Sequence, residues 1–184
     1  MEDKALLSTE EASGAEKAEL LIVIPAYNEA ENIERVVNHL TANFPQYDYV
    51  VVNDGSRDET AAICQRNGYN LLNLPVNLGL AGAFQAGLKY ADKYGYQYAV
   101  QLDGDGQHRP EYLESMIKKM EEGYDIVIGS GLSGRKAITM RMLGSNLIEM
   151  AIRFTTGVNI KDPTSGMRMF SKRMIANLHR ALTT

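Results

Sequence analysis

Short apolar runs alternate with longer segments of helical period along most of this chain. This alternation restricts the folds that the chain can adopt more than any other feature of the sequence. ELLIVIP (19–25) and YDYVVVN (47–53) are typical of buried strands. Between them, EAENIERVVNHL (29–40) places its apolar residues on one helical face: Ile33, Val36, Val37 and Leu40. Strands that alternate with helices predict an α/β fold, with a mostly parallel central sheet and helices on both faces.

The same reading extends to the rest of the chain. Further strands are expected at 70–75, 96–103, 124–130 and the start of 167–182. Further helices are expected at 58–68, 80–95, 110–123, 137–157 and the remainder of 167–182. Glycines end three of these helices, and Pro110 lies in the first turn of another.

Size and composition suit a single globular domain. The 184 residues, 45% hydrophobic and 23% charged, are enough to bury a core. The single Cys64 excludes an internal disulfide framework and fits a reducing compartment. The longest apolar stretch, LLIVIPA, is far shorter than the roughly 20 residues that span a bilayer. Residues 1–19 are polar and acidic, without the apolar core of a signal peptide, and predict a flexible acidic leader. We therefore expect a cytoplasmic location, or one at the cytoplasmic face of a membrane.

Charge is distributed unevenly along the sequence. Residues 1–129 hold 10 Lys/Arg against 21 Asp/Glu, a net charge of −11, whereas residues 130–184 hold 9 against 2, a net charge of +7. A basic C-terminal third indicates an anionic partner such as phosphate, lipid headgroups or nucleic acid, or it simply balances the acidic first part.

Polar residues gather just after the predicted strands. In open parallel sheets, ligands bind at the carboxyl ends of the strands, so these residues are the candidates for a functional site. They are YNE (27–29), NDGS (53–56), DGD (103–105) and GSG (129–131).

Asp103 and Asp105 are alternate residues of an extended segment, so their carboxylates point the same way. Two carboxylates among glycines suit Mg²⁺ or Mn²⁺ with positions left for phosphate oxygens. An acidic Asx-type turn explains the same residues equally well, so this pair alone leaves both readings open. An EF-hand fits worse, because His108 stands where that loop requires glycine.

Asp54 ends the second predicted strand, and a strand–turn–helix junction does not require a carboxylate there. It could accept a hydrogen bond from a base N–H or a ribose hydroxyl. Asp58 and Asn28 are predicted to cap the helices that follow them, and Glu29 suits a first helical turn. Tyr27 could stack on a flat base.

Five motifs together resemble those of family 2 glycosyltransferases, in order and in approximate spacing. They are VIPAYNEAENI, VVVNDGSRDET, NLGLAGAFQAG, QLDGDGQHRPE and DPTSGMRMF. The chain is most similar to the branch that transfers sugars to polyprenyl (dolichyl) phosphate, over residues 20 to about 175. The resemblance implies a single GT-A domain at 20–184, a nucleotide-sugar donor with a uridine or guanosine base, and inversion at the anomeric carbon. It implies no nucleic-acid partner.

Roles follow from the resemblance by matching position. The nucleotide-sugar pocket is expected to include Pro25, Ala26, Tyr27, Glu29, Asp54, Asp103, Gly104 and Gln107, and Arg135 is added as a substitute for an arginine that the branch often has at another position. The expected ligands of a catalytic Mg²⁺ or Mn²⁺ are Asp103, Asp105 and Gln107. Arg168 is expected on the phosphates or the acceptor, and with Asp105 and Asp162 it completes the candidate catalytic residues. With the resemblance added, the metal reading of Asp103 and Asp105 is favoured over the turn.

The chemical class of the acceptor can be inferred from the charges that the reaction creates and from the charge of the chain. Cleavage of the sugar–phosphate bond builds negative charge on the leaving diphosphate, which a divalent ion and Arg168 stabilise. A hydroxyl acceptor requires a general base, whereas a lipid phosphate is already ionised at neutral pH. The sequence has no obvious Glu-Asp dyad, and its last third is basic, so a polyprenyl phosphate is favoured. Asp162, otherwise a turn residue before Pro163, is the candidate base if the acceptor is a glycan hydroxyl.

The sequence departs from the branch in two places. Gly131 stands where an arginine is common, so Arg135 or Lys136 is expected to take over the phosphate contact. The chain also ends soon after SGMRMF, whereas relatives continue, which indicates a C-terminal truncation.

Other readings compete with this one. GSGLSG (129–134) matches a dinucleotide-binding fingerprint, but Glu149 lies within a helical segment and not at a second strand end. A Walker A loop fails because Arg135 follows Gly134. A nucleotidyltransferase and a non-catalytic nucleotide-sugar binding module remain the alternatives. The segment TMRMLGSNLIEMAIRF (139–154) is a core helix or a helix that lies against a membrane surface.

Overall fold

A six-stranded sheet forms the centre of the computed structural model, which describes residues 19–103, 110–129 and 167–181. The strands are β1 (Leu20–Ala26), β2 (Asp48–Asp54), β3 (Leu71–Leu74), β4 (Tyr98–Gln101), β5 (Ile126–Ile128) and β6 (Arg168–Ser171). The helices are α1 (Ile33–Asn43), α2 (Thr60–Arg66), α3 (Gly79–Tyr94), α4 (Leu113–Glu121) and α6 (Lys172–Ala181), with a 3₁₀ turn, η1, at Pro110–Tyr112.

The sheet order is β3-β2-β1-β4-β6-β5. The first four strands pair in parallel, whereas β6 is antiparallel to both β4 and β5. The predicted α/β fold with a mainly parallel sheet is confirmed. The direction of β6 and its insertion between β4 and β5 were not predicted, because no local pattern reveals a partner about 70 residues away.

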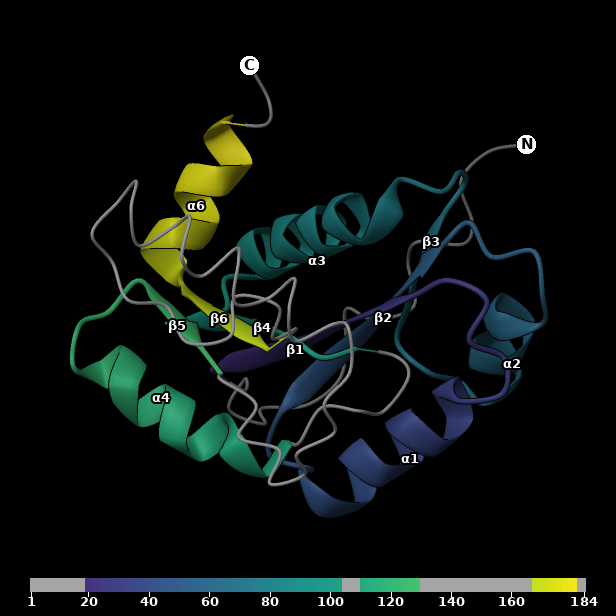
Figure 1. Ribbon diagram of the computed structural model, residues 1–184, viewed down its shortest axis with the longest axis horizontal. Helices are drawn as coiled ribbons and strands as arrows, with labels where there is room; N and C mark the ends of the chain where they lie inside the picture. Colours follow the sequence, from purple (N-terminus) through teal and green to yellow (C-terminus); the bar gives the residue numbers. More distant parts are fainter. Residues whose placement is uncertain (1–18, 104–109, 130–166, 182–184) are drawn as a thin grey trace, which may run out of the picture.

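The two faces of β1 pack into two separate cores. Leu21 and Val23 face α3 and α6, while Ile22 and Ile24 face α1, α2 and α4. Figure 1 shows these helix groups on opposite sides of the sheet. All seven residues of β1 are buried, as expected for a strand covered on both faces. The prediction of helices on both faces is therefore confirmed.

Most predicted elements are present with shifted ends. The helix expected at 29–40 begins at Ile33, because Glu29 to Asn32 form a turn whose backbone bonds precede the helix. Residues 1–18 of the acidic leader expected at 1–19, and the helix expected at 137–157, lie outside the described residues. Within the described ranges, no helix is both long enough and apolar enough to cross a bilayer.

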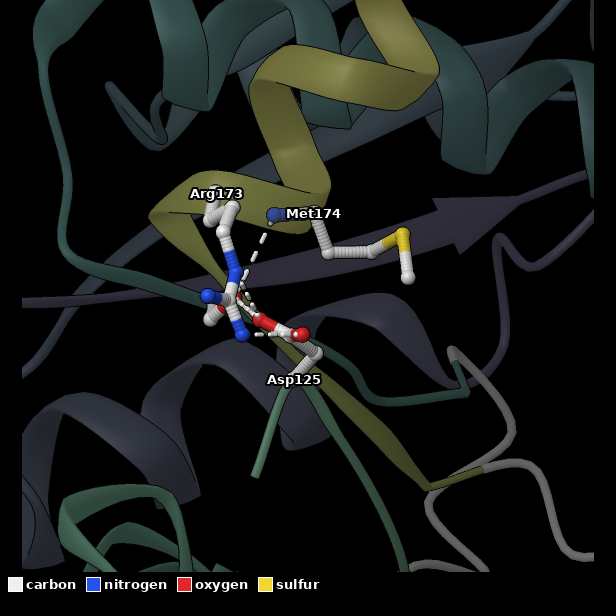
Figure 2. Close-up of polar contacts among 4 residues, drawn as sticks. Asp125, Arg173 and Met174 are labelled. Atoms are coloured by element: carbon white, nitrogen blue, oxygen red, sulfur yellow. Dashed lines mark hydrogen bonds and ion pairs between the residues drawn. The ribbon is translucent and has the colours of Figure 1, made fainter. Parts of the chain in front are cut away.

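Asp125 holds the start of α6 beside β5 (Figure 2). Arg173 donates two hydrogen bonds to its carboxylate, from Nε at 2.9 Å and Nη2 at 2.5 Å. Ser171 Oγ donates to the same carboxylate at 2.7 Å and accepts from the backbone N–H of Met174 at 3.2 Å. The Arg173 and Ser171 hydrogen bonds lower the pKa of Asp125. These contacts hold the C-terminal end of β6 in place.

Gly87 allows α3 to pack directly on β1. A Cβ atom at this position would overlap the side chain of Val23, which is fully buried. Because the backbone of α3 meets the Val23 side chain with no side chain of its own in between, the helix lies close to the middle of β1.

We expect Gly87→Ala to lower the free energy of unfolding by about 1–2 kcal/mol. Overpacking a core costs about 1–3 kcal/mol, whereas alanine returns up to about 1 kcal/mol of helix propensity. Urea unfolding measures the difference. Lys89→Ala, at an exposed site of the same helix, is the matched control and should change stability by less than about 0.5 kcal/mol. Unchanged or increased stability of Gly87→Ala would contradict the close packing on Val23.

Candidate functional site

A pocket of about 320 Å³ opens at the carboxyl ends of β1, β2 and β4. It is lined by Pro25, Ala26, Tyr27, Glu29, Asp54, Asn77, Gly79, Leu80, Ala83 and Asp103. The parallel register produces this convergence, since Ala26 ends β1 opposite Asn53 of β2. Six residues predicted from the sequence for the nucleotide-sugar pocket thus line one cavity: Pro25, Ala26, Tyr27, Glu29, Asp54 and Asp103.

Asp54 is a buried carboxylate at the end of β2, with 2% of its surface exposed. Its Oδ1 accepts a hydrogen bond from the backbone N–H of Leu78 at 2.7 Å. The next residue, Gly55, has φ +63°, and a Cβ there would lie 2.7 Å from backbone atoms of Val76 and Asn77. The carboxylate and the glycine together bring the loop before α3 against the end of β2. One oxygen of Asp54 therefore has an internal partner.

Asn28 does not cap α1, contrary to the sequence prediction. Asn32 occupies the cap position and makes no capping bond through its side chain. Asn28 instead adopts φ +57°, a left-handed conformation that asparagine tolerates better than most residues. Its N–H donates to Ser56 Oγ at 3.0 Å, and its Oδ1 accepts from the N–H of Arg57 at 2.9 Å. Asn28 therefore joins the β1–α1 loop to the β2–α2 loop.

Asp58 and Thr60 join the same two loops. Thr60 Oγ1 accepts from the N–H of Glu29 at 2.9 Å and donates to Asp58 Oδ1 at 2.5 Å. Asp58 Oδ1 also accepts from the N–H of Thr60 at 3.0 Å, and its Oδ2 accepts from the N–H of Ala30 at 3.1 Å. Asp58 thus satisfies the first N–H of α2, as its predicted capping role requires, although Glu59 holds the cap position. We refer to Asn28, Ser56, Asp58 and Thr60 as the inter-loop network.

The pKa of Asp58 lies below its ordinary value. Partial desolvation acts in the opposite direction, but the hydrogen bonds from Thr60 and Ala30 stabilise the ionised carboxylate and outweigh it. These hydrogen bonds therefore favour the ionised form of Asp58.

Asp103 follows β4 and faces the pocket. Its Oδ1 accepts a hydrogen bond from Gln101 Nε2 at 3.0 Å, and Gln101 is 3% exposed. A carboxylate oxygen is the donor type that Mg²⁺ and Mn²⁺ prefer, so Asp103 fits the predicted metal site. Its predicted partners in that site, Asp105 and Gln107, lie outside the described residues, as does Gly104. The described ranges alone bring no three His, Cys, Asp or Glu side chains together as a metal site.

Arg168 is the first residue of β6, and its side chain is exposed. Met169 pairs with Val100 of β4, so Arg168 lies at the sheet edge where β4 ends. This is the edge that carries the pocket, although Arg168 is not among the lining residues. The remaining predicted residues, Arg135 and Asp162, lie outside the described ranges.

One wall of the pocket, formed by Asn77 and the start of α3, was not predicted from the sequence. Asn77 Oδ1 accepts from the N–H of Gly79 at 2.9 Å. Leu80 also lines the pocket and is 58% exposed, and its neighbour Leu78 is 56% exposed. This wall belongs to the motif NLGLAGAFQAG, which contributed to the family resemblance. The motif contains no charged residue that would have indicated a binding site.

Residues 21–178 match the sequence profile of glycosyl transferase family 2. The chain belongs to this family. The predicted family is therefore confirmed, and its match includes every described residue that lines the pocket.

Curated relatives confirm the predicted resemblance to the polyprenyl-phosphate branch. Polyprenol monophosphomannose synthase of Mycolicibacterium smegmatis is 31% identical over 168 residues, 86% of this chain and 63% of the relative. UDP-N-acetylglucosamine--dolichyl-phosphate N-acetylglucosaminyltransferase of Methanococcus voltae is 31% identical over 185 residues, 89% of this chain and 73% of the relative. The chain thus spans about two thirds of the length of these relatives.

Solved structures of two other proteins share the fold of this chain at low identity. Glucosyl-3-phosphoglycerate synthase from Mycobacterium tuberculosis, in complex with UDP, superposes with a TM-score of 0.65 at 20% identity, over 84% of this chain and 57% of the other. A mannosyltransferase from Pyrobaculum calidifontis, in complex with GDP-Man and Mn²⁺, gives 0.60 at 18% identity, over 89% and 47%. The predicted GT-A glycosyltransferase fold is confirmed.

We expect the stability contributed by Asp58 to depend on pH. Because its pKa is lower in the folded protein, the stabilisation is present above the ordinary aspartate pKa of 3.8 and is lost as pH falls through the folded value. Asp58→Asn should therefore unfold at a lower urea concentration than the unmodified chain at neutral pH. The difference in urea midpoint between the variant and the unmodified chain should disappear at acidic pH. A difference in midpoint that stays constant across the acidic range would show that the charge on Asp58 contributes nothing to stability.

Proposed function

We propose that this chain is the nucleotide-sugar-binding part of an inverting, metal-dependent glycosyltransferase that transfers a sugar to a polyprenyl phosphate. The observation that supports it best is the single pocket formed by Tyr27, Glu29, Asp54 and Asp103, within a chain of family 2. Relatives named for transfer to polyprenyl, undecaprenyl and dolichyl phosphates support the acceptor class.

The donor base lies between Tyr27 and Asp54 in this proposal. Tyr27 is 43% exposed at the pocket, which leaves its ring available for stacking on a base. Asp54 Oδ1 is occupied by the N–H of Leu78, so the second oxygen is the one that accepts from the donor. A buried carboxylate held by a backbone N–H needs no reorientation when it binds.

Asp103, with Asp105 and Gln107, would hold the divalent cation, and the cation would in turn bind the diphosphate. Mn²⁺ is present in complexes of two structural relatives, and either Mn²⁺ or Mg²⁺ suits carboxylate ligands. When bound, the ion stabilises the negative charge that grows on the leaving diphosphate. Gln101 orients Asp103 by donating to Oδ1, and Arg168 supplies positive charge at the same edge of the sheet.

An acceptor phosphate attacks the anomeric carbon from the face opposite the diphosphate, which inverts the configuration. Being ionised at neutral pH, it needs no general base, and Asp162 has that role only if the acceptor is a glycan hydroxyl. A lipid acceptor implies peripheral contact with the cytoplasmic face of a membrane. The net charge of +7 over residues 130–184 would favour an anionic surface.

We expect one nucleoside diphosphate, UDP or GDP, to bind in a metal-dependent way. Calorimetric titration with each nucleotide, with and without Mn²⁺ or Mg²⁺, measures this. Asp103→Asn should weaken metal-dependent binding roughly tenfold or more, because outer and direct metal contacts are typically worth that much. Glu114→Gln, an exposed acidic site on α4, should bind as the unmodified chain does. Binding that is equally tight without metal would remove Asp103 from a metal site.

The reaction itself separates the candidate enzyme classes. We expect the nucleotide sugar that matches the bound base, together with a polyprenyl phosphate, to yield free nucleoside diphosphate and a glycosylated lipid. Release of pyrophosphate would instead identify a nucleotidyltransferase. Binding without turnover would identify a nucleotide-sugar binding module. Chromatography of the nucleotide products distinguishes the three outcomes.

A further inference from the structure

We propose that Thr60 and Asp58 are positioning residues, which set the affinity for the nucleotide-sugar donor without touching it. They act through the β1–α1 loop, whose Tyr27 and Glu29 line the pocket. Neither Thr60 nor Asp58 is among the lining residues. The proposal depends on the function proposed above, and it assigns a role to a part of the chain outside the pocket.

The strand ladder alone cannot hold the two loops together. The paired register of β1 and β2 stops at Ala26 and Asn53. Tyr27 and Glu29 come directly after that point on one strand, and Asp54 ends the other. Beyond the last backbone pair, the relative positions of these pocket residues depend on side-chain contacts between the loops.

Thr60 is the centre of those contacts. Its side chain is fully buried, at 0% exposed. A hydroxyl has one hydrogen to donate, and Thr60 donates it to Asp58 Oδ1 at 2.5 Å. The oxygen is thereby oriented to accept from the N–H of Glu29 at 2.9 Å. Asp58 then reaches the next residue, accepting from the N–H of Ala30 at 3.1 Å.

Asn28 and Ser56 form a second set of contacts beside the first. One bond runs from the N–H of Asn28 to Ser56 Oγ, and another from the N–H of Arg57 to Asn28 Oδ1. Three consecutive residues of the β1–α1 loop, 28 to 30, therefore donate their N–H groups to side chains of the β2–α2 loop and of Thr60, the first residue of α2. Tyr27 immediately precedes this run, and Glu29 lies within it.

The consequence for binding is preorganisation. A loop that is already ordered loses less conformational freedom when a ligand binds, so the same contacts give a higher affinity. Loss of the Thr60 hydroxyl removes a hydrogen-bond acceptor from the N–H of Glu29 and a donor from Asp58. We therefore expect weaker donor binding, with little change in the chemical step once the donor is bound.

A matched pair of substitutions at Thr60 tests this. Thr60→Val keeps the shape of the side chain and removes the hydroxyl, whereas Thr60→Ser keeps the hydroxyl. Thr60→Val should weaken binding of the preferred nucleoside diphosphate with Mn²⁺ about tenfold, and should raise the donor KM by a similar factor with kcat changed less than about twofold. Thr60→Ser should remain within about threefold of the unmodified chain. Ser115→Ala, at an exposed site on α4, is the control for a distant hydroxyl.

Ser56→Ala provides a second test if Thr60→Val does not fold, as judged by thermal unfolding. It removes only the acceptor for the N–H of Asn28 and should weaken donor binding about threefold. The proposal is overturned if folded Thr60→Val, or Ser56→Ala in its place, binds the nucleotide as tightly as the unmodified chain. It is also overturned if Thr60→Ser binds as weakly as Thr60→Val, since the hydroxyl would then not matter. Failure of the unmodified chain to bind UDP or GDP would overturn the proposed function and this role with it.

Discussion

The register of β1 with its two parallel neighbours determines where the described part of the candidate site lies. Val23 pairs with Val50 on one side and with Gln101 on the other. Parallel strands aligned in this way end at the same edge of the sheet. Three residues that follow this row by a few positions therefore meet at one pocket: Ala26, Asp54 and Asp103. The burial of β1 on both faces makes a change of register costly, because a one-residue slip would exchange its two hydrophobic faces.

Beyond the ends of the strands, side chains replace the backbone ladder as the source of order. Asp54 accepts from the N–H of Leu78 and places the loop before α3. The inter-loop network does the same for the loops that follow β1 and β2. Short polar side chains suit this work, because their oxygens reach a neighbouring backbone N–H with few rotatable bonds to order. The pocket therefore has three loops on its border that are tied to one another independently of any ligand.

The sequence was sufficient wherever local pattern and strand order decide the outcome. Buried runs, helix faces and the polar strand ends could all be located, and Tyr27, Glu29, Asp54 and Asp103 do line one pocket. It was insufficient where a partner lies far along the chain. Asn28 looked like a helix cap because asparagine favours that position, but its partners are Ser56 and Arg57, 28 and 29 residues away. The pocket wall from α3 was missed for a similar reason. Small and aliphatic residues cannot be recognised as binding residues from the sequence alone.

The antiparallel strand β6 has a consequence that a fully parallel sheet would not allow. A parallel strand presents its last residue at the pocket edge, whereas β6 presents its first, Arg168. Because Met169 pairs with Val100, this cation reaches the edge where Asp103 follows β4, although 65 positions separate the two residues in the sequence. At the other end of β6, Ser171 and Arg173 bind Asp125, so the strand cannot slide without breaking those bonds. The C-terminal part of the chain thereby supplies positive charge to an edge of the sheet that its N-terminal part makes acidic.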